Sequence, residues 1–451
     1  MISTTAQGER GLGPAEERGG ARGARREILT DVALLALLAL FLYLPGIGSR
    51  DLQSVDEIRY SEVAREMIAS ESWLVPILNG ETYMEKPALF FWLLSVPALI
   101  AGEVTVVGSR LVPVFFSILT LIFTYGIGRV LLGRRGGLWA AAILGTIFSF
   151  GSYSQHAVFD IPLTAATTLS LFAYVVWSRT GRHPTAMKVL CYVAMGFGVL
   201  LKGPIAILLP GLVMAADTVP RERWKALRTP HLFWGPLLTL GVFLLWFAPA
   251  AWSAGPEYLD YMFKRHIVDR SISGSAPHAH SIFYYLHKLI ADALPWTPLL
   301  LPAAVCAWRA LRGDPGRAGG RADAGLRLGS IWCAVMLVTL SPIASKRGRY
   351  LLPIYPGVAL LLSAWFEAVR ARGGIFEGRL EHLMVGATRH ALALMVALGV
   401  VVLIAWQVAG AFDIDLLAEL PDSKEIRHLQ GGEAPLYGAI ALEGIVLLSI
   451  A

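Results

Sequence analysis

Long apolar runs constrain this chain more than any other feature of its sequence. Blocks of about 17–25 apolar residues with few charges recur along it, and a helix of about 20 such residues crosses the hydrocarbon core of a bilayer. Only 16% of the residues are charged, whereas soluble globular proteins average about 25%. The sequence therefore predicts an all-α polytopic membrane protein. It excludes a disordered chain, a coiled coil and an ordinary soluble enzyme.

The positions of these runs predict about eleven full spans and a last apolar run at the end of the sequence. They cover residues 28–48, 104–131, 137–156, 161–178, 188–202, 203–219, 231–252, 287–308, 327–343, 351–368, 389–411 and 434–451. The run at 88–101 is shorter and follows Pro87, which favours an interfacial or re-entrant helix. Residues 1–27, rich in Gly, Arg and Glu, are predicted to form a disordered cytoplasmic tail.

Basic residues predict the orientation of these spans. With the N-terminus inside and 88–101 not spanning, most of the Arg and Lys residues fall in the cytoplasmic loops, as membrane insertion favours. This reading explains the net charge of +6 without nucleic acid. Its outside segments include a long first loop at 49–103 and a later loop at 253–286. The membrane module then extends over 28–411, and 412–451 form an outside loop and a final, truncated span.

The first outside loop carries a compact polar motif. Ser54 followed by Glu57 is a capping box, which predicts that a helix begins here. Asp56 then lies in the first turn, where the helix dipole favours its ionised form. Arg59 and Tyr60 share its face at spacings of three and four. The alternative is a solvated interfacial helix held by local ion pairs.

Two charged residues interrupt apolar segments farther along the chain. Asp160 lies between two predicted spans, and an intramembrane aspartate indicates function unless it caps a helix at the water boundary. Lys202 precedes Gly203-Pro204, which breaks an apolar run of helical length. A lysine at such a break favours an anionic ligand.

Other outside segments add cations and aromatic rings. Lys346, Arg347 and Arg349 precede Tyr350 in an outward segment, against the charge rule, which also favours an anionic ligand. Lys86 alone is equally consistent with a lysine that reaches the membrane surface. The sequence has neither a phosphate-binding GxxxxGK[ST] loop nor a Rossmann glycine pattern. An enzyme outside the cytoplasm then needs a pre-activated donor in the membrane, such as a lipid-linked sugar phosphate.

These segments resemble a known family. Asp56-Glu57-Ile-Arg59-Tyr60-Ser-Glu62, Trp73-Leu-Val-Pro76 and Glu85-Lys86-Pro87 resemble the first periplasmic loop of ArnT-like glycosyltransferases. These enzymes are relatives of the protein O-mannosyltransferases and have the GT-C membrane fold. The resemblance continues in order through Phe159-Asp160-Ile-Pro162, Leu201-Lys202-Gly203-Pro204, His266-Ile-Val-Asp-Arg270 and the Tyr350 segment, over roughly residues 30–370.

The resemblance implies a function at a bacterial inner membrane. The protein would transfer a glycosyl group, with inversion, from an undecaprenyl- or other polyprenyl-phosphate sugar to lipid A or another envelope glycan, lipid or protein on the periplasmic face, acting as a monomer. Asp56 and Asp160 match catalytic positions. The positions that match substrate or phosphate ligands are Arg59, Tyr60, Tyr83, Lys86, Lys202, Arg270 and Tyr350. Glu85 and His266 match positions that hold a metal ion, and both side chains suit Zn²⁺.

Two features leave alternatives open. Arg265 stands before His266, where the arabinose transferases usually have glutamate, so the sugar and the acceptor are not fixed by the motifs. A transporter or flippase for an anionic lipid-linked substrate is the competing class, and it predicts inverted repeats with paired broken helices. The sequence shows one such break, at Gly203-Pro204. A non-catalytic membrane scaffold is a third class, and it leaves the clustered charges without a role.

Overall fold

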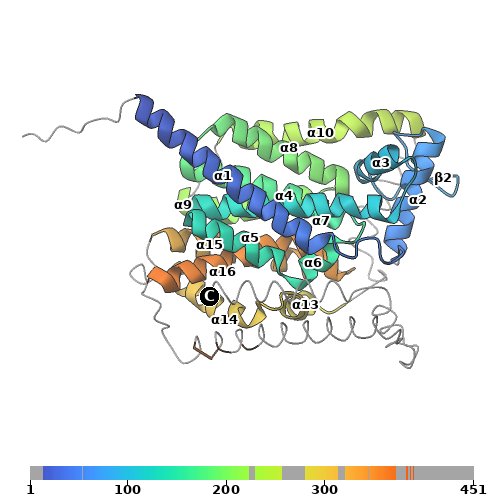
Figure 1. The fold of residues 1–451 in the computed structure, drawn as a ribbon. Coiled ribbons are helices and arrows are strands. Elements are labelled where there is room, and N and C mark those ends of the chain that lie inside the picture. The colour runs from blue at the N-terminus through green and yellow to red at the C-terminus, as the bar shows by residue number, and fades with distance from the viewer. Residues whose placement is uncertain are drawn as a thin grey trace, which may run out of the picture.

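The computed structural model describes residues 14–52, 54–222, 229–255, 280–312, 320–343 and 345–371, with four single positions between 382 and 390. This part of the chain is a bundle of helices with one two-stranded hairpin (Figure 1). The long helices are α1 (Pro14–Tyr43), α4 (Val106–Leu132), α7 (Asp160–Thr180), α8 (Pro184–Lys202), α9 (Ile205–Glu222), α10 (His231–Ala254), α15 (Arg321–Leu340) and α16 (Tyr355–Ala371). Residues 256–279 of the predicted loop at 253–286 lie outside the described residues, and so does the segment 412–451.

Six helices in the described part are long and apolar enough to cross a membrane, or seven if one bent pair counts as a span. They are α4, α7, α8, α10, α15 and the continuous segment Gly348–Ala371, which joins the 3₁₀ helix η3 (Gly348–Ile354) to α16. The polytopic all-α prediction is confirmed for this part of the chain. Helix α3 (Leu89–Ala101) has 13 residues, which agrees with the prediction that the run at 88–101 does not span.

Two predicted spans are wrong in detail because each is broken. Residues 137–156 form α5 (Arg134–Gly145) and α6 (Phe148–Ser154), separated where the Thr146 hydroxyl bonds back to the carbonyl of Ala142. Residues 287–308 form α13 (Tyr284–Asp292) and α14 (Thr297–Leu311), bent by 116°. Pro295 lies at this bend, and its ring cannot continue the preceding helix.

The boundaries predicted for the first helix are also wrong. Helix α1 begins at Pro14 and ends at Tyr43, so about half of the predicted 1–27 tail is helical. Proline suits the first helical position, and the Glu, Arg and Ala residues that follow are good helix formers. The prediction relied on an apolar pattern to recognise a helix. Polar helix formers can extend a helix beyond its apolar segment, so the lack of that pattern did not mark the start of α1.

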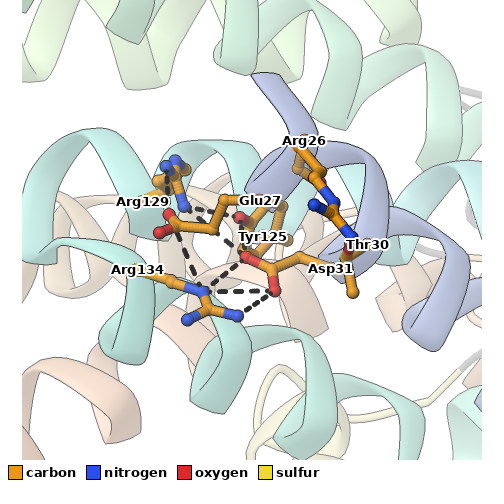
Figure 2. A network of polar contacts seen from close by, with 7 residues as sticks. All are labelled: Arg26, Glu27, Thr30, Asp31, Tyr125, Arg129 and Arg134. Carbon is orange, nitrogen blue, oxygen red and sulfur yellow. Dashed lines mark hydrogen bonds and ion pairs between the residues drawn. The ribbon is translucent and has the colours of Figure 1, made fainter. Parts of the chain in front are cut away.

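A buried ionic network fixes α1 against α4 and α5 (Figure 2). The Asp31 side chain is fully buried, and its Oδ1 accepts a hydrogen bond from Arg134 Nη2 at 2.7 Å. Tyr125 donates to Asp31 Oδ2 at 2.6 Å, and Arg129 lies 3.5 Å from the same oxygen. Arg129 also donates to Glu27 at 2.7 Å. One buried carboxylate therefore ties together three helices.

We expect Asp31→Asn to lower the stability of the protein by about 1–3 kcal/mol, because it leaves Arg129 and Arg134 without their shared carboxylate. Thermal unfolding in detergent measures the loss. Thr30→Ala is the matched control on the same helix, since Thr30 bonds only its own helix, at the Arg26 carbonyl, from an exposed position. Equal melting temperatures for Asp31→Asn and Thr30→Ala would contradict the role of the network.

The first outside loop gathers at one end of the bundle, where Figure 1 shows α2 (Val55–Ser70), α3 and the hairpin together. Strands β1 (Ile77–Leu78) and β2 (Glu81–Thr82) pair antiparallel around Asn79 and Gly80. Both turn residues have positive φ, 54° and 76°, as a two-residue Asn-Gly hairpin turn requires. Glu66 of α2 accepts the backbone N–H groups of Asn79 and Gly80 at 2.7 and 3.1 Å. This contact fixes the hairpin, and hence the segment Tyr83–Lys86, against α2.

Candidate active site

The predicted capping box begins α2 as the sequence indicates. Ser54 Oγ accepts the Glu57 backbone N–H at 3.1 Å, and α2 starts at Val55. The Asp56 carboxylate therefore lies in the first turn and keeps 12% of its side-chain surface exposed. Tyr60, one turn later, is buried against Phe159 and its neighbours. Helix α2 thus carries the partly exposed carboxylate of Asp56 one turn before Tyr60, which belongs to an aromatic cluster.

Asp56 binds two arginines from the segment before α16. Arg347 Nη1 donates to Asp56 Oδ2 at 2.6 Å, and Arg349 Nη2 donates to the same oxygen. Burial of this carboxyl favours its neutral form, but the charges of Arg349 and Arg347 outweigh burial and hold the Asp56 pKa below its ordinary value. The solvated interfacial helix is therefore wrong as a description of α2, since its aspartate pairs with residues almost 300 positions away.

Asp160 extends this arrangement into the protein. Its side chain is 1% exposed, Lys202 Nζ donates to its Oδ1, and Arg349 Nε lies 3.2 Å from its Oδ2. Lys202 is the last residue of α8, which ends at Gly203 with φ of 86°, a conformation that suits glycine. The predicted helix break is confirmed. It brings the Lys202 ammonium to the start of α7.

Aromatic rings hold the two lysines of the site. Lys202 Nζ lies 3.8 Å from the centroid of the Tyr350 ring and 5.3 Å from that of Phe159. Lys86 Nζ lies over the same Phe159 ring at 5.4 Å. Cation–π contacts at these distances orient ammonium groups without neutralising them. Phe159 therefore joins two segments that are more than 100 residues apart in the chain.

The remaining predicted residues line the same region. Arg59 Nη1 lies 3.8 Å from Glu85 Oε2, with both side chains about one-third exposed. Tyr83 is buried and packs edge-on against Phe91. Burial raises the pKa values of Tyr60 and Tyr83, so both keep their hydroxyl protons. The structure thus brings together Asp56, Arg59, Tyr60, Tyr83, Glu85, Lys86, Asp160, Lys202 and Tyr350.

Two predicted residues, His266 and Arg270, lie outside the described residues. Zinc binding by Glu85 and His266 therefore stays a prediction. Within the described ranges, no group of three or more His, Cys, Asp or Glu side chains is placed to hold a metal ion. The Glu85 carboxylate faces Arg59 instead.

The structure also contains a buried ion pair, Glu57 with Arg110, that was not predicted from the sequence. Glu57 Oε1 lies 3.3 Å from Arg110 Nε of α4 and accepts the Ala157 backbone N–H at 2.9 Å; both charged side chains are 1% exposed. Arg110 also donates to the carbonyl oxygens of residues 47, 50 and 51 at 2.8–2.9 Å. The pair therefore fixes the start of α2 relative to α4 and to the segment that leads to Asp160. An arginine inside a predicted span was the signal that could have found it.

The sum of charges indicates what this site binds. The side chains described above give five cations against three carboxylates: Arg59, Lys86, Lys202, Arg347 and Arg349 against Asp56, Glu85 and Asp160. Arg and Lys in this number suit a phosphate group. Helix α2, which carries Asp56 and Arg59, lies with the hairpin at one end of the bundle (Figure 1).

The lowered pKa of Asp56 predicts a pH dependence of stability. A carboxyl with a lowered folded-state pKa stabilises the protein above its unfolded pKa, about 3.9, and this stabilisation is lost as pH falls through the lower folded value. We therefore expect Asp56→Asn to melt below the wild type at pH 7. The difference in melting temperature should shrink as the pH falls below about 4. A difference that stays constant from pH 7 to pH 3 would contradict the ion pairs of Asp56.

Comparison with known proteins identifies relatives of this chain. Residues 28–262 match the family model described as dolichyl-phosphate-mannose-protein mannosyltransferase. The undecaprenyl phosphate-α-4-amino-4-deoxy-L-arabinose arabinosyl transferase of Yersinia enterocolitica is 30% identical over 342 residues, which are 74% of this chain and 58% of that protein. The enzyme of the same name from Pectobacterium carotovorum is 31% identical over 350 residues, 76% of this chain and 60% of its own length.

A solved structure shows the same fold. ArnT from Cupriavidus metallidurans, crystallised with undecaprenyl phosphate, superposes with a TM-score of 0.66 at 21% identity over 92% of this chain and 77% of that one. Fold and site thus define the class of this protein as the membrane proteins of the GT-C glycosyltransferase fold. Within that class, the chain belongs to the dolichyl-phosphate-mannose-protein mannosyltransferase family and is ArnT-like, as its motifs predicted. It spans about three-fifths of the length of the curated relatives that it matches.

Proposed function

We propose that this protein transfers a glycosyl group from a polyprenyl-phosphate sugar to an acceptor at the outer face of a bacterial inner membrane. The observation that carries the proposal is the pairing of an ionised, partly exposed Asp56 with a cationic site at one end of a membrane bundle. The names of the relatives support the donor class, since they act on undecaprenyl phosphate-linked arabinose. A phosphate headgroup on a lipid chain can reach such a site from the bilayer.

The reaction that the resemblance to ArnT-like enzymes implies is an inverting displacement at the anomeric carbon. The acceptor oxygen forms a bond to that carbon while the bond to the donor phosphate oxygen breaks, and its electron pair leaves with the phosphate. When the acceptor is a hydroxyl group, its proton passes to the Asp56 carboxylate. The phosphate changes from a diester to a monoester and gains negative charge, which the excess of cations stabilises most in the transition state.

The two aspartates have different parts in this reaction. Asp56 retains exposed surface and is the group placed to meet an acceptor, whereas Asp160 is buried between Lys202 and Arg349. Asp160 therefore acts as a positioning residue, which holds these two cations toward the phosphate. Arg59, Lys86 and Lys202 supply charge for the phosphate, and Tyr60, Tyr83 and Tyr350 form the aromatic wall of the site.

The acceptor and the orientation belong to the proposal as well. A lipid A-like lipid is the acceptor that the ArnT-like motifs support best, with another envelope glycan or a protein as the alternative. The charge distribution of the sequence supports a site on the periplasmic side. The monomeric state stays a prediction.

A reconstituted assay tests the proposed function. The purified full-length protein is incubated in proteoliposomes with a bacterial membrane lipid extract, which contains the polyprenyl-linked sugars, and the products are separated by mass spectrometry. We expect free polyprenyl phosphate to appear together with a glycosylated acceptor. Movement of the donor across the bilayer without either product would contradict transfer and favour the flippase class.

A further inference from the structure

Asp56 is covered by two guanidinium groups that differ in their surroundings. Arg349 is 10% exposed and also lies against the buried Asp160, so carboxylates on two helices hold it in place. Arg347 is 35% exposed and contacts the same Oδ2 atom of Asp56 at 2.6 Å. It is the less enclosed of the two partners. Movement of Arg347 would leave the contact between Arg349 and Asp160 intact.

The contacts of Arg347 and Arg349 with Asp56 conflict with its proposed role as the general base. A general base must present an oxygen to the acceptor proton and must have enough affinity for that proton. Two guanidinium groups occupy one oxygen of Asp56 and lower the affinity of the carboxylate for a proton. With both arginines in place, Asp56 is therefore a weaker base than an unpaired aspartate. Removal of one guanidinium group during the reaction would raise the affinity of Asp56 for a proton.

We propose that Arg347 is a movable counterion, which covers Asp56 in the empty site and transfers to the donor phosphate when the donor binds. The inference rests on the proposed function, because it assigns the phosphate of the lipid-linked donor as the competing anion. Phosphate offers a guanidinium group the same planar pair of oxygens as a carboxylate does. Donor binding would thereby remove one of the two guanidinium groups from Asp56 Oδ2, so Asp56 becomes a stronger base when a sugar donor is present.

The other groups around Asp56 do not substitute for Arg347. The titratable and charged side chains that act on it or lie next to it come from its own helix, from the hairpin segment, from η3 and from α7: Arg59, Tyr60, Tyr83, Arg349 and Asp160. Arg59 lies 3.8 Å from Glu85, and Arg349 is more enclosed than Arg347. The tyrosines stay neutral. Among these described groups, Arg347 is the cation whose transfer changes the cover of Asp56 most directly.

Binding of a phosphate probe to four variants tests the inference. Farnesyl phosphate is titrated in detergent against the full-length wild type, Asp56→Asn, Arg347→Gln and the double variant, with farnesol as the control without phosphate. We expect Arg347→Gln to weaken binding of farnesyl phosphate about tenfold. Asp56→Asn should tighten it about fivefold, because Arg347 no longer has to leave a carboxylate. In the Arg347→Gln background the same Asp56→Asn change should have almost no effect.

Asp160→Asn provides the matched control, because it also removes one negative charge from the site but does not contact Arg347. Its effect on farnesyl phosphate binding should be the same with and without Arg347. Additive effects of Asp56→Asn and Arg347→Gln would overturn the movable counterion and leave the donor site intact. If Arg347→Gln does not fold, a failure of Asp56→Asn alone to tighten binding overturns it. Equal binding of farnesyl phosphate and farnesol to the wild type would instead contradict the proposed function.

Discussion

Asp56→Asn is expected to lower the rate of sugar transfer at least a hundredfold, because it removes the carboxylate that accepts the acceptor proton. General-base catalysis contributes about 10²–10⁴-fold in enzymes. Asparagine keeps the size of the side chain and still accepts hydrogen bonds from Arg347 and Arg349, so the protein should remain folded. The measurement is the rate of release of polyprenyl phosphate by purified protein at saturating donor.

Glu62→Gln is the matched control for this variant. It also neutralises a carboxylate on α2, but Glu62 forms its ion pair with the exposed Arg65 of the same helix. Its transfer rate should stay near that of the wild type, because Glu62 contacts none of the charged side chains described at the site. Near-normal transfer by Asp56→Asn, with a melting curve that shows a folded protein, would remove Asp56 from the chemistry.

Arg110→Leu is expected to destabilise the protein by about 3–5 kcal/mol, the largest effect on folding that the described residues predict. The change leaves the Glu57 carboxylate buried without its cation and leaves three carbonyl oxygens, at residues 47, 50 and 51, without their donor. Chemical unfolding in mixed micelles, followed by tryptophan fluorescence, measures the loss. The first outside loop should lose its attachment to α4 before the rest of the bundle unfolds.

Two further variants separate this effect from a simple loss of charge. Arg65→Leu removes an exposed arginine that faces Glu62, and exposed pairs contribute about 0–1 kcal/mol. The double variant Glu57→Gln with Arg110→Leu should be less unstable than Arg110→Leu alone, because no unpaired charge stays buried. Equal stability of Arg110→Leu and Arg65→Leu would contradict the structural role of the buried pair.

The fold was predictable from the sequence wherever one physical rule dominates. Uninterrupted apolar runs correctly predicted α4, α7, α8 and α10, because a span must satisfy its backbone groups within its own helix. The Ser54 cap and the break before Pro204 depend on local backbone chemistry and were also predicted correctly. The breaks between α5 and α6 and between α13 and α14 were missed, because apolar composition does not reveal where a buried helix turns.

The site was predicted as a set of residues, but its pairing was not. The sequence identified Asp56, Asp160, Lys202 and the Arg347–Tyr350 segment separately. The arguments were the helix start at Ser54, the free-energy cost of a charge within an apolar segment and the excess of cations in an outside segment. It did not show that Arg349 bridges both aspartates, because that contact depends on how α2, α7 and η3 pack together. Nor did it show that Glu57 faces Arg110. Pairs that are this distant in the chain follow from packing, which single-residue patterns do not contain.

The most direct test of the central claim compares the envelopes of cells that express the wild type, Asp56→Asn or no protein. Mass spectrometry of the lipids, glycans and envelope proteins shows whether an acceptor gains the mass of one glycosyl unit. We predict that this product appears only with the wild type, while the polyprenyl-phosphate sugar accumulates with Asp56→Asn. A glycosylated product that is equally abundant in all three cell types would contradict sugar transfer by this protein.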